Sequence, residues 1–223
     1  MKSNSKENIY RVLFKRIIGG TYPKGLRLKE AELAAEFGVS RTPIREVLQL
    51  LSQDGLTDIL PNRGATVTSL TPDDIEEIYE IRKALELLAL DFSISRMNLE
   101  DLKGLRGRIL EDSWRENSGA KPYDRLLSVA AIDQELHRFI VSSSGKQRII
   151  DMVNRLLRIV QHIRFIGFGN AVLSKKVTQE HLGIIDALTL RDLNESQRLL
   201  ADHLTKSKQA AIQVICSAGN VEP

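Results

Sequence analysis

The sequence predicts a mainly α-helical protein in two parts, and three observations lead to this prediction. Apolar residues recur at helical spacing along most of the 223 residues. Hydrophobic residues make up 42% of the chain but aromatic residues only 5%, which is typical of an aliphatic helical core. Strand-like segments occur only near the start, so we expect a small mixed domain over residues 1–70 and an antiparallel all-α helical bundle over residues 71–223.

The first 70 residues predict two helices, a tight turn, a third helix and a hairpin. The first two helices are expected near residues 5–18 and 29–37, with the segment TYPKGLRL between them as a loop. Gly38 allows a tight turn, and Ser40 is a good N-cap for the third helix. The segments TDIL and ATV then predict two short strands joined by the turn PNRG. This order of elements is that of a winged helix-turn-helix.

The third helix has one apolar face and one basic face. At about 100° per residue, one side carries Ile44, Val47, Leu48 and Leu51, and the other carries Arg41, Thr42, Arg45 and Gln49. Arginine can donate two parallel hydrogen bonds to guanine, and the helix N-terminus favours a phosphate. Arg63, at the tip of the hairpin, can reach the DNA backbone or an adjacent minor groove. An ordinary solvated face is the alternative interpretation, but the order of turn, capped helix and hairpin favours DNA.

The distribution of charge agrees with a DNA-binding first domain. The net charge of the chain is only +3. Residues 1–70 nevertheless carry 11 Lys and Arg against 7 Asp and Glu, whereas residues 71–223 carry 21 against 22. The basic excess therefore lies where phosphate groups would be neutralised.

The second part predicts helices almost to its end. Thr71 is a candidate cap, and Pro72 occupies the first helical position, where its missing N–H has no cost. The expected helices lie near residues 72–94, 98–116, 122–142, 146–166, 174–190 and 193–215.

Four side chains of this second part predict a metal site. Asp133 and His137 are four residues apart and share one helix face. His181 and His203 lie at similar distances on either side of the turn near residues 191–192, so an antiparallel helix pair places them at nearly the same height. One carboxylate and three imidazoles suit zinc, or else nickel, iron or manganese. The alternative is that each residue is an ordinary surface or packed side chain.

The segments FGVSRTPIREVLQLLSQDGL and PNRGATV resemble the DNA-binding domain of the GntR family of bacterial transcription regulators. The resemblance covers about residues 5–70. It implies that Arg41, Arg45 and residues around the wing glycine contact an operator, with Ser40, Thr42 and Gly64 also at contact positions. One position departs from the family: Ala31 stands where many members have an arginine, between Glu30 and Glu32. We expect a contact made there by relatives to be missing.

The later segments IYEIRKALELLALDFS, IDQELHRFIVSSSGKQRI and QEHLGIIDALTLRDLNESQRLLADHL resemble the FCD-type effector domain of the FadR subfamily. The resemblance implies an antiparallel helical bundle in which Asp133, His137, His181 and His203 bind a divalent metal. It also implies a small organic acid as effector rather than a fatty-acyl group. Arg82 is then a candidate anchor for the acid's carboxylate, and an exposed arginine paired with Glu86 or Glu80 is the alternative. Whether His162 faces the cavity is left open.

These features predict a ligand-responsive, DNA-binding transcriptional regulator and not an enzyme. We expect a repressor that binds a near-palindromic operator as a homodimer. The single cysteine, Cys216, and the lack of an apolar run of roughly 18–20 residues favour a cytoplasmic protein without membrane spans. Two alternatives remain, a metal-dependent enzyme with a DNA-binding head and a DNA-binding dimer without an effector. The effector, the operator sequence and the metal are not determined by the sequence.

Overall fold

The computed structural model describes residues 5–18, 20–61, 63–68, 71–115, 122–166 and 175–219. The chain divides into two compact units, one of residues 1–71 with 158–166 and the other of residues 72–157 with 167–223. We call residues 5–68 the head, and we call residues 72–157 and 175–219 the bundle. None of the described helices combines the length and the apolar character that a membrane span requires.

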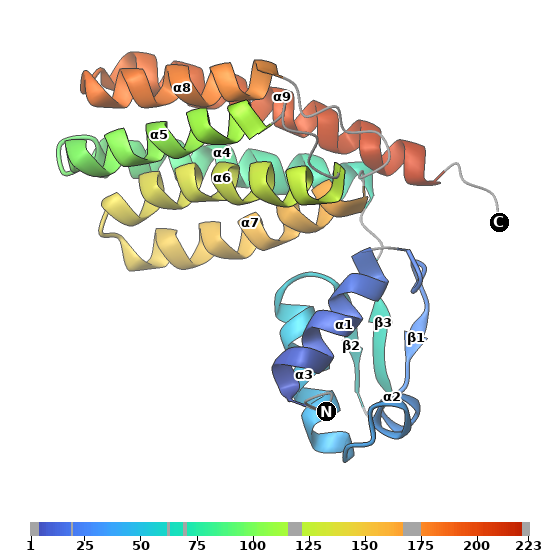
Figure 1. Cartoon of the computed structure of the whole chain (residues 1–223). Helices are drawn as coiled ribbons and strands as arrows, with labels where there is room; N and C mark the ends of the chain where they lie inside the picture. The colour runs from blue at the N-terminus through green and yellow to red at the C-terminus, as the bar shows by residue number, and fades with distance from the viewer. Residues whose placement is uncertain are drawn as a thin grey trace. The chain divides into compact units, whose positions relative to one another are not determined.

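The head has the predicted order of elements and one additional strand (Figure 1). Its elements are α1 (Lys6–Ile18), β1 (Arg27–Leu28), α2 (Glu30–Phe37), α3 (Arg41–Gln53), β2 (Thr57–Leu60) and β3 (Gly64–Val67). The strands form one antiparallel sheet in the order β1-β3-β2. Strand β1 corrects the prediction of a loop, since Arg27 lies opposite Thr66 and Leu28 opposite Ala65. Two residues are too few to show the alternation by which a strand is recognised.

Helix α3 is fixed by its apolar face. Ile44, Val47, Leu48 and Leu51 are all buried, in one core with residues of α1 such as Ile9 and residues of the sheet. Gly38, in the turn before α3, has a φ of 65°, a left-handed conformation that glycine adopts without strain. The turn and the core together hold the opposite face of α3 toward solvent.

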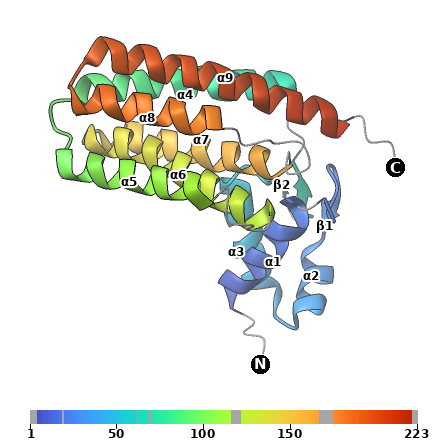
Figure 2. The ribbon, with the colours of Figure 1, turned by 45° about the horizontal axis from the view of Figure 1, so that its top comes forward.

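The bundle contains helices α4 (Pro72–Ser93), α5 (Leu99–Arg115), α6 (Pro122–Ser143), α8 (Lys175–Thr189) and α9 (Leu193–Gly219), and the part of α7 (Gln147–Ile166) up to residue 157. Each begins within a residue of its predicted start, and α9 continues four residues beyond its predicted end. Figures 1 and 2 show these helices side by side, with α4 in contact with α6 and α9, and α8 in contact with α5 and α9. The breaks expected between helices at residues 117–122 and 167–170 lie outside the described residues, apart from Pro122, as does the side chain of His162.

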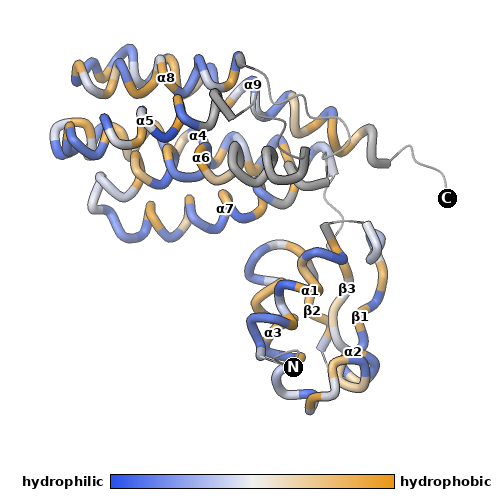
Figure 3. Tube along the Cα trace, viewed as in Figure 1, coloured by the Kyte–Doolittle hydropathy of each residue, from blue (hydrophilic) through white to orange (hydrophobic). Residues whose placement is uncertain are grey.

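The core of the bundle is aliphatic. Leu90 of α4, Leu136 and Ile140 of α6, Ile184 of α8 and Leu200 of α9 are fully buried in one cluster. Figure 3 shows the corresponding alternation of apolar and polar residues around the helices. Against this background, a group of buried charged and polar residues on α4, α6, α8 and α9 requires a separate explanation.

Candidate DNA-binding surface and metal centre

The exposed face of α3 carries the side chains predicted to read DNA. Arg41, Thr42, Arg45 and Gln49 are all exposed. Ser40 occupies the N-cap position as predicted, but its side chain makes no capping hydrogen bond. Because Ser40 is exposed, water can take the place of the cap. The amides at the N-terminus of α3 therefore keep their capacity to bind an outside acceptor such as a phosphate oxygen.

Arg45 has a partner that the sequence did not reveal. Its Nε donates to Oε1 of Glu30 at 2.9 Å and its Nη2 donates to Oε2 at 2.8 Å. The hydrogen bond from Arg45 lowers the pKa of the Glu30 carboxyl below its ordinary value. Glu30 begins α2, 15 residues before Arg45, so helical spacing along one element gives no signal for this pair.

The wing is the hairpin formed by β2 and β3, and its residues Arg63 and Gly64 lie in different environments. Arg63 is exposed, and its carbonyl oxygen accepts hydrogen bonds of 3.2 Å from both Nε and Nη2 of Arg27. Gly64 is buried with a φ of +91°, and a Cβ added to it would lie 2.1 Å from the carbonyl oxygen of Leu28. The fold therefore requires glycine at this position whether or not it contacts DNA. The DNA contact of Gly64 stays a prediction.

A shallow hollow of about 230 Å³ connects the exposed face of α3 with the wing. Its lining comes from α2, α3 and the hairpin: Glu30, Arg45, Leu48, Gln49, Ile59, Leu60 and Gly64. The pair formed by Arg45 and Glu30 is thus part of the same surface as the wing.

In the bundle, the four predicted metal ligands meet. Asp133 and His137 come from α6, His181 from α8 and His203 from α9, and all four are buried. Their candidate ligand atoms lie within 4.8 Å of one another. The Nε2 atoms of His181, His203 and His137 lie 3.1, 3.5 and 3.7 Å from Oδ1 of Asp133. Three imidazoles therefore surround one carboxylate oxygen.

Two further carboxylates orient two of the imidazoles through their Nδ1 atoms, on the side of the ring away from Asp133. Nδ1 of His137 lies 2.6 Å from Oε2 of Glu86, and Nδ1 of His203 lies 3.1 Å from Oε2 of Glu180. Glu180 also accepts a hydrogen bond of 2.9 Å from Nζ of Lys206. An imidazole that donates from Nδ1 to a carboxylate has its Nε2 lone pair free for a metal. The sequence by itself does not indicate that either carboxylate is a partner of a histidine.

The chemistry of the four ligands fits a divalent metal. Within the described residues, Nε2 of His137 and Nε2 of His203 are buried and have no hydrogen-bond partner. Each such atom costs about 1–3 kcal/mol if it stays unsatisfied. A metal bound at the Nε2 atoms would satisfy both, and the set of one carboxylate and three imidazoles suits zinc, nickel, iron or manganese.

The local environment gives two of the imidazoles opposite pKa shifts. Burial lowers the pKa of His181 to about 4, although the hydrogen bond with Asp133 opposes this shift. Burial also disfavours the charged form of His203, but the neighbouring carboxylates of Asp133 and Glu180 outweigh burial and raise its pKa. Without metal, His203 therefore binds a proton more readily than His181 does.

This difference predicts a titration that NMR can follow. In protein stripped of metal by a chelator, His203 should be protonated and His181 neutral at about pH 6, just below the ordinary histidine pKa. The Cε1–H resonances, assigned with His181→Gln and His203→Gln variants, measure both states. If the two rings titrate together near the ordinary histidine pKa, the proposed environments are wrong.

Arg82 lies inside the bundle rather than on its surface. Its side chain is fully buried, and its Nε donates to Oε1 of Glu86 at 2.5 Å. The terminal Nη1 and Nη2 atoms have no hydrogen-bond partner within the described residues. The pairing of Arg82 with Glu86, which was the alternative to a carboxylate anchor, is therefore present. The arginine is nevertheless buried and not exposed, and its two terminal nitrogens remain available as donors. Glu86 holds Arg82 with one oxygen and His137 with the other.

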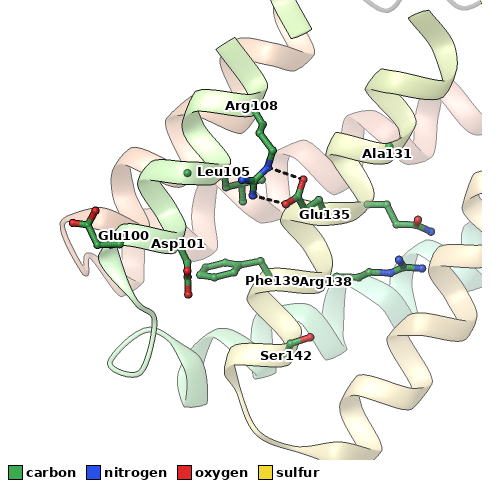
Figure 4. A pocket seen from close by; sticks show the side chains of 11 residues that line it. Glu100, Asp101, Leu105, Arg108, Ala131, Glu135, Arg138, Phe139 and Ser142 are labelled. Carbon is green, nitrogen blue, oxygen red and sulfur yellow. Dashed lines mark hydrogen bonds and ion pairs between the residues drawn. The ribbon is translucent and has the colours of Figure 1, made fainter. Parts of the chain in front are cut away.

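A second hollow, of about 540 Å³, lies on the outer side of α5 and α6 (Figure 4). Arg108 of α5 spans it and donates from Nε to Oε2 of Glu135 at 3.2 Å. Arg138, Phe139 and Ser142 also line it, but none of the four predicted metal ligands does. Helix α6 therefore separates this hollow from the buried cluster.

Comparison with known proteins assigns both parts of the chain. A family model described as bacterial regulatory proteins of the gntR family matches residues 5–67, and a model of the FCD domain matches residues 77–206. The HTH-type transcriptional regulator YdhC of Bacillus subtilis is 28% identical over 194 residues, which cover 87% of this chain and 85% of YdhC. The HTH-type transcriptional repressor RspR of Escherichia coli is 25% identical over 208 residues, covering 93% and 89%. The solved structure of E. coli McbR/YncC has the same fold, with a TM-score of 0.74 at 20% identity over 96% of this chain and 99% of that one.

Proposed function

Because this chain belongs to the GntR family of transcriptional regulators and carries an FCD domain, we propose that it is a repressor controlled by a small organic acid. The family makes it a DNA-binding regulator with an effector domain, which supports a regulator over an enzyme. The acid would bind at a divalent metal in the bundle. Its binding would shift the population of protein that is competent to hold the operator.

The observation that carries this proposal is the set of unsatisfied donors and acceptors buried in the bundle. Two imidazole Nε2 atoms lie beside Asp133, and two terminal nitrogens of Arg82 have no partner among the described residues. A metal would be held by Asp133, His137, His181 and His203, and would supply a positive charge with positions open to an anionic ligand. Arg82 would donate Nη1 and Nη2 to a carboxylate, the planar anion that a guanidinium fork matches.

Glu86 links the candidate acid anchor, Arg82, to one of the candidate metal ligands, His137. Both of its oxygens are occupied, one by Nε of Arg82 and the other by Nδ1 of His137. Burial by itself would raise the pKa of Glu86, but Arg82 and His137 outweigh burial and lower it to about 2. Glu86 is therefore ionised at neutral pH and orients the candidate acid anchor and one candidate metal ligand together.

In the head, we assign operator contacts to the exposed face of α3 and to the wing. Arg41 and Arg45 would read bases, and Thr42 and the N-terminus of α3 at Ser40 would contact a phosphate. Arg63 would contact the backbone or the minor groove beside Gly64. Their exposure and the exposed N-terminus of α3 support this assignment.

We further propose a homodimer on a near-palindromic operator. Helix α4 exposes Ile81, Leu88 and Phe92, which are 43%, 44% and 36% accessible and lie on one helix face. An apolar stripe of this kind marks a protein interface, and a second copy of the chain is the partner that a two-fold operator requires. Sedimentation of the pure protein as a monomer at about micromolar concentration would contradict the dimer.

Elemental analysis of the purified protein tests the metal. We expect about one metal per chain in the parent protein and almost none in the His181→Ala, His203→Ala double variant. A double variant on the surface, Arg106→Ala with Arg108→Ala, is the control and should keep its metal, since both side chains form exposed ion pairs on α5. A crystal structure of the protein as purified would show any acid retained on the metal. A metal-free parent that still responds to an acid would disprove the metal's part.

A further inference from the structure

Arg45 is held by Glu30 along only one edge of its guanidinium group. The edge formed by Nε and Nη2 faces the carboxylate, with hydrogen bonds of 2.9 and 2.8 Å to its two oxygens. Arginine has five N–H donors, so this contact leaves both protons of Nη1 and one proton of Nη2 uncommitted. The free end of the group is the pair of nitrogens that reaches O6 and N7 of a guanine. Glu30 and a base can therefore bind Arg45 at the same time.

The Glu30 side chain is held more firmly by the fold than the Arg45 side chain is. The Glu30 side chain is 18% exposed, whereas the Arg45 side chain is 60% exposed. Glu30 also begins α2, whose Leu33 and Ala34 are buried in the core of the head. Exposed ion pairs usually add little to stability, but a bidentate pair restricts a long side chain to one geometry. The contact thus reduces the freedom that Arg45 loses on binding a base.

We propose that Glu30 is a positioning residue that orients Arg45 toward one base of the operator and thereby sets the base preference at that position. This inference rests on the proposed contact between Arg45 and DNA. On the proposed DNA-binding surface, the Glu30 carboxylate would weaken binding to DNA of any sequence, because it and the phosphates are both negatively charged. Glu30 therefore lowers the affinity for DNA of any sequence and increases the discrimination between bases.

The neighbouring Glu32 offers a matched control. Both glutamates lie in the first turn of α2, so the helix N-terminus favours the negative charge of both. Glu32 pairs with Lys29, at 2.6 Å, and not with an arginine of α3. Glu30→Gln and Glu32→Gln remove the same charge from the same turn, but only the first changes the support of Arg45.

The experiment uses the full-length protein and a duplex that the parent protein selects from a random-sequence pool. Affinity for this duplex is compared with affinity for a scrambled duplex of the same composition, at one fixed salt concentration. Glu30→Gln should lower the ratio of the two affinities about tenfold, within the range expected for losing one well-formed arginine–guanine contact. Glu32→Gln should leave the ratio unchanged. In an Arg45→Ala background, Glu30→Gln should have no further effect on the ratio.

A second selection, made with the Glu30→Gln protein, separates positioning from a general loss of structure. The base preference should weaken at one base pair in each half-site and remain at the others. Equal behaviour of Glu30→Gln and Glu32→Gln would overturn the inference. So would tighter binding of Glu30→Gln to the selected duplex with the ratio preserved, because the ion pair would then compete with DNA. An Arg45→Ala protein with an unchanged ratio would instead refute the Arg45 contact itself.

Discussion

Replacing Arg41 and Arg45 together by alanine should lower affinity for a selected operator duplex at least about 30-fold without unfolding the head. A bidentate contact to a base contributes about 1–3 kcal/mol of discrimination, and two such contacts give the expected loss. Both side chains are exposed on α3, so their removal should leave the free energy of unfolding nearly unchanged. Fluorescence anisotropy with a labelled duplex measures the first quantity, and urea unfolding measures the second.

The control for this prediction removes two positive charges elsewhere. Arg106→Ala with Arg108→Ala has the same change in net charge, but these arginines pair with Asp186 and Glu135 in the bundle. This variant should keep the parent's affinity. Affinity for a scrambled duplex adds a second criterion, since loss of phosphate contacts alone weakens binding to all sequences uniformly. A uniform loss on selected and scrambled duplexes would mean that neither arginine reads a base.

Replacing Arg82 by methionine should have the largest effect on stability in the bundle, about 3–5 kcal/mol. The reason is the buried Glu86 carboxylate, which would lose one of its two partners and remain ionised in the core. In the parent protein the stabilisation from ionised Glu86 is complete above the unfolded pKa of about 4.5 and is lost as pH falls toward 2. The difference between parent and variant should therefore shrink over this range. Urea unfolding at several pH values measures it.

A double variant separates the structural part of Arg82 from its proposed part in binding. Arg82→Met with Glu86→Gln removes both buried charges, so it should recover most of the lost stability. We expect short hydroxy and keto acids that raise the unfolding temperature of the metal-loaded parent to have no effect on this double variant. Stabilisation of the double variant by the same acids would show that the carboxylate is anchored elsewhere.

Much of this architecture is predictable because its signals are local. Helix boundaries follow from apolar spacing and caps, and Pro72 begins α4 as predicted. The approach of His181 to His203 follows from their similar distances to one turn, and the two ring centroids lie 4.7 Å apart. The strand β1 was missed because its only evidence is its pairing with β3, which is a tertiary contact.

The partners of the functional side chains were not predictable for a related reason. Glu86 and His137 are 51 residues apart on different helices, and neither residue type indicates the other. The sequence did name Glu86 as a neighbour of Arg82, but as part of an exposed pair, since a charged i, i+4 pair is usually on the surface. Burial depends on how α4 packs with α6 and α9, and a single helix does not contain this information.

The wing also has a consequence for anyone who redesigns the head to recognise another DNA sequence. The side chain at position 63 can be varied, because the exposed Arg63 side chain makes no hydrogen bond or ion pair within the described residues. Only backbone atoms of Arg63 are held: its N–H donates to the carbonyl oxygen of Leu60, and its own carbonyl oxygen accepts from Arg27. Position 64 cannot be varied, since any side chain there would begin 2.1 Å from the carbonyl oxygen of Leu28. A library that randomises both positions would lose most of its members to misfolded wings. A library that keeps Gly64 and varies the tip would sample new DNA contacts on an intact hairpin.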